Sequence, residues 1–176
     1  MKRITLILLT PYLLFGGIVL VNPNATPLED SNHFRTTLLE SEQVMIFEGL
    51  PHQAWESDLL QIEKQREDIT LIWEYHFYSP SIKLDNTDGV KNILGEKESI
   101  LLFSGPKLCG GFHPDYCISW STNKKRFYCL ICYGCDELVF YDGINDFKYE
   151  IKENELEALK IILKKYAHKR PSKKQD

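Results

Sequence analysis

The sequence lacks the short motifs by which many enzymes are recognised, and it lacks an excess of basic charge. It contains no phosphate-binding glycine loop, nucleophile elbow, His-Glu-x-x-His or spaced carboxylate pair. With 21 basic and 25 acidic residues, its formal charge of −4 disfavours a nucleic-acid partner. No fixed-period repeat occurs, and 10 Gly and 8 Pro in 176 residues exclude a collagen-like or low-complexity chain. The sequence therefore reveals no reaction, and whether the protein is an enzyme stays open.

The N-terminus has the composition of an export signal. Lys2 and Arg3 precede an uncharged, mostly apolar run from Ile4 to Val21, which is typical of a secretory signal peptide or an N-terminal membrane anchor. As a helix this run would be about 27 Å long, slightly less than the roughly 30 Å hydrocarbon core. Cleavage and retention both stay open. We expect an exported protein, periplasmic or otherwise extracytoplasmic, that is secreted or held at the membrane by this segment.

Composition divides the remainder of the chain. Residues 22–42 mix Asn, Pro, Thr, Ser and acids without periodicity, which is typical of a linker. Positions 164–176 carry six basic residues and one acidic residue, which indicates a solvated C-terminal tail. We therefore predict a signal peptide or anchor over 1–25, a linker over 26–42, a single domain over 43–168 and a basic tail over 169–176.

Hydrophobic patterning predicts an α+β fold. Short β-type runs occupy 43–50, 69–78 and 99–103, and four more form two hairpins, 116–121 with 126–132 and 137–142 with 147–152. Helical spacing appears over 52–65, 85–97 and 153–166. We expect helices packed on one face of a mainly antiparallel sheet.

All five cysteines lie within 27 positions of this second half. They are Cys109, Cys117, Cys129, Cys132 and Cys135. The texts Cys109-Gly-Gly-Phe-His-Pro-Asp-Tyr116 and Cys132-Tyr-Gly-Cys-Asp-Glu137, with Gly49-Leu-Pro-His52 upstream, resemble an uncharacterised family of small, often exported bacterial proteins. The family pattern is K-x-CGGFHPDY followed by C-x-G-C-x-E, and the resemblance covers much of residues 45–171. Because the family has no established activity, the resemblance implies positions and no mechanism.

The spacing of these residues suits a structural zinc site. Cys132 and Cys135 enclose a turn in which Gly134 can take a positive φ, so that both sulfurs converge. Cys109 and His113 could supply the other two ligands. Such a closed four-ligand site would stabilise the fold and leave no open position for catalysis.

Two other assignments of the cysteines stay open. In an oxidising compartment neighbouring cysteines are more often disulfides, and Cys117 and Cys129 face each other across the first predicted hairpin, as a disulfide or as two buried thiols. Alternatively, Cys132 and Cys135 could cycle as a thiol-redox pair, although no helix N-terminus is expected there to lower a thiol pKa. We therefore predict a small binding or structural domain of unknown partner, with an extracytoplasmic thiol-redox protein as the alternative.

Aromatic and histidine residues outside this cluster are interpreted more simply. The run containing Trp73, Tyr75 and Phe77 is expected to fill a strand's core face. His52 and His76 lack partners in the local sequence, so we expect them to be surface or hydrogen-bonded side chains, not ligands.

Overall fold

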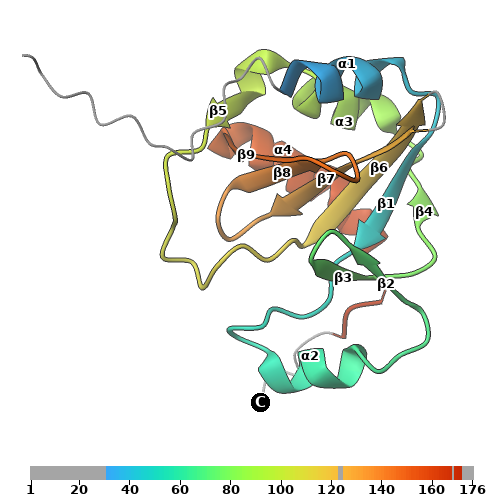
Figure 1. Cartoon of the computed structure of the whole chain (residues 1–176), viewed down its shortest axis with the longest axis vertical. Coiled ribbons are helices and arrows are strands. Elements are labelled where there is room, and N and C mark those ends of the chain that lie inside the picture. The colour runs from blue at the N-terminus through green and yellow to red at the C-terminus, as the bar shows by residue number, and fades with distance from the viewer. Residues whose placement is uncertain (1–30, 123–124, 168, 172–176) are drawn as a thin grey trace, which may run out of the picture.

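A computed structural model describes residues 31–122, 125–167 and 169–171 (Figure 1). The predicted signal peptide or anchor over 1–25 lies outside the described residues, as do residues 172–176. Within the described part of the chain, every helix is too short or too polar to cross a membrane.

The chain forms four α-helices and nine strands within these residues. The α-helices are α1 (Asn32–Glu40), α2 (Ser57–Glu63), α3 (Thr87–Leu94) and α4 (Glu153–Leu163), with short 3-10 turns η2 (Lys97–Ser99) and η3 (Lys164–Tyr166). The strands are β1 (Val44–Glu48), β2 (Ile69–Ile72), β3 (Tyr75–Tyr78), β4 (Ile82–Lys83), β5 (Ile100–Leu102), β6 (Tyr116–Thr122), β7 (Lys125–Cys132), β8 (Glu137–Tyr141) and β9 (Asp146–Ile151).

Seven strands form one sheet in the order β4-β1-β6-β7-β8-β9-β5, and β2 pairs with β3 in a separate hairpin. Every strand pair is antiparallel. The predicted α+β class with a mainly antiparallel sheet is therefore confirmed.

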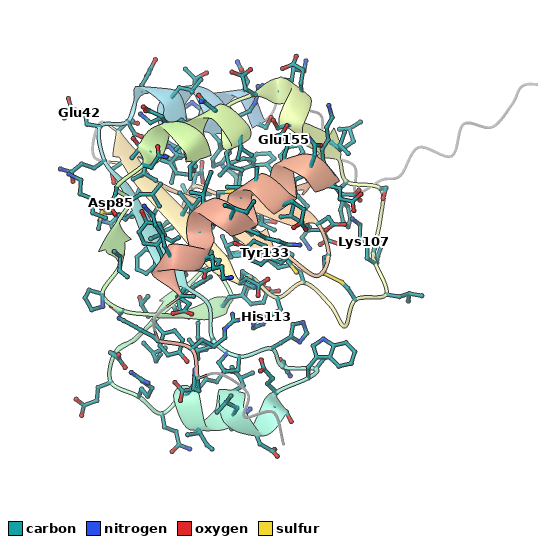
Figure 2. All side chains as sticks on the ribbon, turned by 180° about the vertical axis from the view of Figure 1, so that it is seen from behind. Glu42, Asp85, Lys107, His113, Tyr133 and Glu155 are labelled. Atoms are coloured by element: carbon teal, nitrogen blue, oxygen red, sulfur yellow. A yellow bond between two sulfur atoms is a disulfide. The ribbon has the colours of Figure 1, made fainter. Side chains whose placement is uncertain are left out.

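One face of the sheet is covered by α1, α3 and α4, as Figures 1 and 2 show from opposite sides. Alternate strand residues point to this face because side chains alternate along a strand. Ile118, Phe140 and Tyr149 are fully buried there against helix residues such as Leu159. Burial of this large apolar surface supplies most of the driving force for folding.

Helix α1 corrects the predicted linker over 26–42. Its side chains Phe34 and Leu38 are buried in the core, and the Thr37 hydroxyl accepts a hydrogen bond of 3.0 Å from the indole of Trp120. The Ser31 side chain caps no helical N–H, and the first turn holds no acidic residue. Tertiary packing stabilises this helix where local capping signals are weak.

The other face of the sheet is covered by the β2–β3 hairpin and by loops. The predicted single strand over 69–78 is wrong, because the chain reverses at Trp73, whose φ is 54°. Phe77 of this hairpin is fully buried against Cys117, Leu130 and Val139 of the sheet. The aromatic run thus fills a core, as predicted, but from a hairpin that lies on the sheet.

The start of the predicted tail also belongs to the fold. The Lys169 N–H donates to Glu48 Oε2 at 2.8 Å, and Arg170 Nε donates to the Gly49 carbonyl at 3.0 Å. These two residues therefore hold the end of the chain against β1, which corrects the tail boundary at 169.

Candidate functional site

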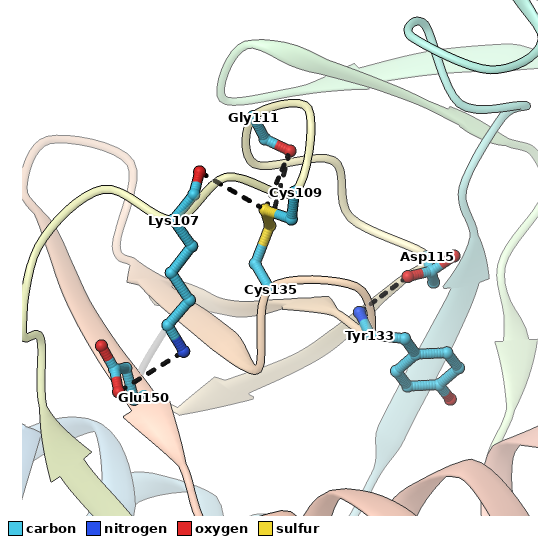
Figure 3. The surroundings of a disulfide bond; sticks show 7 residues. All are labelled: Lys107, Cys109, Gly111, Asp115, Tyr133, Cys135 and Glu150. Carbon is cyan, nitrogen blue, oxygen red and sulfur yellow. Dashed lines mark hydrogen bonds and ion pairs between the residues drawn. A yellow bond between two sulfur atoms is a disulfide. The ribbon is translucent and has the colours of Figure 1, made fainter.

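A disulfide joins Cys109, in the loop between β5 and β6, to Cys135, in the turn between β7 and β8 (Figure 3). The two cysteines are 26 positions apart in the sequence. The Cys135 sulfur lies 3.5 Å from the Gly111 carbonyl oxygen, so the glycine loop passes directly over the bond. This link fastens the loop that contains His113 to the hairpin-covered face.

The possible Cys117–Cys129 disulfide does not form, and both residues are buried free thiols, the other arrangement expected for this pair. The register of β6 and β7 pairs Cys117 with Leu130 and Ile118 with Cys129. A shift of one residue sends a side chain to the opposite face of a sheet. Cys117 therefore packs in the hairpin-covered core and Cys129 in the helix-covered core.

The four residues predicted to bind zinc are only partly brought together. Cys109 and Cys135 are bonded to each other, and the imidazole of His113 contacts the Leu50 carbonyl oxygen at 2.8 Å. Within the described ranges, no group of three or more His, Cys, Asp and Glu side chains could hold a metal ion. Zinc coordination stays a prediction that the oxidised arrangement leaves untested.

Cys132 is the last residue of β7, directly before the four-residue turn over 133–136, and it pairs with Glu137 of β8. The left-handed residue of this turn is Asp136, with φ 54°, and not Gly134 as the sequence suggested. Burial raises the pKa of the Cys132 thiol, while hydrogen bonds from the backbone N–H groups of His113, Cys135 and Gly134 oppose that rise. The sulfur is thus buried and held by three donors.

Asp115 fixes the other end of the loop. Its backbone N–H donates to the Ile131 carbonyl at 2.8 Å, and its carbonyl accepts from the Gly49 N–H at 2.7 Å. Its carboxylate accepts from the Tyr133 N–H at 2.8 Å and pairs with Arg170 at 3.2 Å. One residue therefore connects β1, the β7–β8 turn and the chain end.

Gly49 is required where β1 meets this loop. A Cβ placed on Gly49 would overlap the carbonyl oxygen of Pro114. The absence of a side chain lets the two backbones approach closely. The Gly49-Leu-Pro-His52 turn and the His113 loop are thereby packed side by side.

Two histidines meet at this junction, their ring centroids 4.5 Å apart. Because the Leu50 carbonyl can only accept, Nε2 of His113 carries the hydrogen and Nδ1 keeps the lone pair. Nδ1 of His52 accepts from the Ala54 N–H at 3.0 Å, so neutral His52 carries its hydrogen on Nε2. Burial lowers the pKa of both imidazoles, which favours their neutral forms.

Both histidines border an open cavity of about 460 Å³. A third imidazole, His76, lines it as well, and burial lowers the pKa of that ring too. Aromatic and aliphatic walls come from Tyr75 and Phe112 with Leu50, Leu60 and Ala54; polar residues complete the rim, namely Gln53, Lys64, Glu74 and Gly110. The cavity lies between the β2–β3 hairpin, the α2 segment and the disulfide-linked loop.

Sequence reasoning missed His52, His76 and Tyr75 as site residues. Nothing in one sequence places the Gly49-Leu-Pro-His52 segment beside His113. Its only local signal was a turn that ends in a histidine.

Comparison of the chain with protein-family models, with curated proteins and with solved structures finds no match. The site must therefore be interpreted from its own chemistry. The resemblance to a family of exported bacterial proteins stays an expectation.

Proposed function

We propose that the protein is a small binding domain whose ligand occupies the cavity bordered by His52, His76 and His113. The observation that carries this proposal is the convergence of three largely neutral imidazoles on one cavity from three separate chain segments. Convergent polar groups in a partly apolar cavity, with shifted pKa values, are typical of binding sites.

The size of the cavity supports a small molecule as the ligand. Its volume of about 460 Å³ falls within the roughly 300 to 1,000 Å³ of small-molecule sites. Two other open cavities, of about 520 and 660 Å³, are larger. Neither of these is lined by a histidine, so we assign binding to the imidazole-lined cavity.

The lining indicates a planar heteroaromatic ligand. Tyr75 and Phe112 offer ring faces and edges, which stack on flat molecules. Nε2–H of His52 is a donor and Nδ1 of His113 an acceptor, since the other nitrogen of each ring is already engaged. A flat ring that carries an acceptor nitrogen could stack on these aromatic side chains and accept a hydrogen bond from Nε2–H of His52.

Titration with benzimidazole and adenine as probes, followed by NMR of the histidine side chains, tests this proposal. We expect saturable binding of at least one probe with shifts at His52 and His113. Ala54 is exposed and lines the cavity, so Ala54→Leu should weaken binding about tenfold without unfolding the protein. Ser121→Leu, an exposed position on the 660 Å³ cavity, is the matched control and should bind normally. If neither probe binds saturably, the proposal is wrong.

For the reduced protein, we propose that zinc binds at Cys109, His113, Cys132 and Cys135. The N–H donors around Cys132 support this, because such donors stabilise a thiolate ligand. Metal analysis after reduction and zinc addition should find about one zinc per chain, and none in Cys132→Ser. A reduced protein that stays metal-free would refute it.

We also propose that the protein is exported. The basic start and apolar run over residues 1–25 support this, and so does a disulfide, since disulfides persist in oxidising compartments. Protease added to cells from which the outer envelope has been removed should digest the protein. Complete protection until the cells are lysed would contradict export.

A further inference from the structure

Three of the five cysteines lie at one end of the β7–β8 hairpin. Cys135 is bonded to Cys109, and Cys132, the last residue of β7, precedes Cys135 by three positions. Cys132 pairs with Glu137 across the β7–β8 ladder, and Cys135 stands two positions before Glu137 in the short connection between them. Cys135 is therefore bonded to Cys109 and shares a short connection with Cys132.

Cys132 is held where it can reach Cys135. The backbone N–H groups of His113, Gly134 and Cys135 lie around its sulfur, and the residue is 1% exposed. Small thiols in solution cannot reach so buried a sulfur, whereas a cysteine in the adjoining turn can. Cys132 is thus suited to internal exchange.

Cys109 is the accessible member of the group. It follows Leu108, which is fully exposed, and precedes Gly110 and Gly111, whose φ values are 84° and 92°. It also borders the open cavity of about 520 Å³. Lys107 and Lys148 line the same cavity together with the carboxylates of Glu137 and Asp146. If the bond to Cys135 were released, Cys109 would present a reactive sulfur to solvent.

We propose that Cys109, Cys132 and Cys135 form a thiol–disulfide exchange centre that reacts with small-molecule disulfides through Cys109. First, the Cys132 thiol loses its proton to solvent base, and the thiolate attacks the Cys135 sulfur. The Cys132–Cys135 bond forms, the Cys109–Cys135 bond breaks, and the electron pair leaves with Cys109 as a thiolate. No net oxidation occurs in this step.

In the second step the Cys109 thiolate attacks a small-molecule disulfide. One half of that molecule becomes bonded to Cys109, and its S–S bond breaks. The other half leaves as a thiolate that takes a proton from water. The protein ends with a Cys132–Cys135 bond and a mixed disulfide on Cys109. This activity goes beyond ligand binding in the imidazole-lined cavity and does not depend on it.

The native, oxidised protein tests this proposal with 4,4′-dithiodipyridine, which releases a coloured thiopyridone on exchange. We expect about one equivalent per chain, with the label on Cys109 and a Cys132–Cys135 bond found by peptide mass spectrometry. Cys132→Ser should lower the release at least tenfold, because nothing then frees Cys109. Cys129→Ala removes a buried thiol of the helix-covered core and should leave the release unchanged. Label on Cys132, or absence of release from the wild type, would overturn the proposal.

A second variant keeps the proposal testable if Cys132→Ser fails to fold. Cys109→Ser removes an accessible side chain from an exposed loop. We expect it to contain a Cys132–Cys135 disulfide, so that only Cys117 and Cys129 react with a thiol reagent after unfolding. Four reactive thiols in the unfolded variant would show that Cys132 does not replace Cys109, and the exchange mechanism would be wrong.

Discussion

The two faces of the sheet are built differently. The helix-covered face packs against α1, α3 and α4 through a nearly continuous apolar core. The hairpin-covered face has a smaller aromatic core and is otherwise closed by loops, a disulfide and hydrogen bonds to Asp115. Histidines that line a cavity, the exchangeable cysteines and the chain end all lie on this second side. The larger apolar core thus lies on one face of the sheet, and the cavity and the cysteine cluster lie on the other.

Substitutions on the two faces should therefore change different properties of the protein. A truncation in the helix-covered core removes buried apolar contacts and should lower stability most. A change among the loops removes single constraints, so it should affect ligand binding and exchange more than stability. The following predictions test that division, from the largest effect on stability to the smallest.

Phe140→Ala should have the largest effect. Phe140 is fully buried, and its ring packs 5.4 Å from that of Phe34 and 5.9 Å from that of Tyr149. Loss of this side chain should lower the free energy of unfolding by about 3 to 5 kcal/mol in urea denaturation. Ile161→Ala, at a position 77% exposed on α4, is the control and should change it by less than about 0.5 kcal/mol. Equal effects would mean that the helix-covered core is not the main source of stability.

Cys135→Ala should come next, because it removes the shared sulfur. Closing a loop between cysteines 26 positions apart contributes about 3 to 4 kcal/mol in the chain-entropy account. We expect a loss of up to that size by urea denaturation, while thiopyridone release persists, because Cys109 is then a free thiol that reacts without help from Cys132. Cys117→Ala, outside the disulfide, should retain the release. Full stability in Cys135→Ala would show that the disulfide does not constrain the fold.

Gly49→Ala should separate binding from stability. The new methyl group meets the Pro114 carbonyl oxygen, so β1 and the His113 loop must move apart. We expect a stability loss of about 1 to 3 kcal/mol and a weaker response of His113 to benzimidazole and adenine. Gly134→Ala, where an added Cβ meets nothing within 4 Å, should leave both unchanged. Unaltered probe binding in Gly49→Ala would show that the close approach of Gly49 to Pro114 does not shape the cavity.

Arg170→Met should show how much the chain end contributes. Arg170 pairs with Asp115 at 3.2 Å and donates to the Gly49 carbonyl, and its own side chain is 24% exposed. Loss of these partly buried contacts should cost about 1 to 2 kcal/mol, measured by urea denaturation. Lys165→Met, whose exposed side chain contacts Asp85 at 3.5 Å, should cost less. The reverse order would mean that the chain end is not a structural part of the site.

Acidic pH should destabilise the protein through the hairpin-covered face. Burial lowers the pKa of His113 below its usual 6.5, so the unfolded chain binds a proton more readily than the fold. This contribution to stability is complete above about pH 6.5 and falls as the pH drops from there through the folded pKa. His113→Gln, which keeps a donor for the Leu50 carbonyl, should flatten the fall between pH 7.5 and 5. An unchanged slope would exclude His113 as its source.

The sequence predicted most of the fold because its patterns were local. The β6–β7 and β8–β9 hairpins and α4 follow from alternation and helical spacing, and Asn86 caps α3 through the Gly89 N–H. Helix α1 escaped prediction because the packing of Phe34 and Leu38 stabilises it more than local capping does. The turn at Trp73 was not predicted because a non-glycine residue there takes a positive φ.

The site was less predictable because it depends on register and on distant segments. A single-residue difference in the pairing of β6 and β7 separates Cys117 from Cys129. Sequence spacing predicted that Cys109 and Cys135 lie in one cluster, but it did not predict the disulfide bond between them. The meeting of His52 with His113 depends on the close approach of Gly49 to Pro114, which no local pattern encodes.

Binding of benzimidazole and adenine to the oxidised wild type and to Cys135→Ala, compared by histidine NMR, tests the central claim most directly. If the disulfide-linked loop shapes a ligand cavity on the hairpin-covered face, His52 and His113 should respond saturably in the wild type. The same response in Cys135→Ala should then need at least about tenfold more probe. Equal binding by the two proteins, or absence of binding by the wild type, would contradict the account.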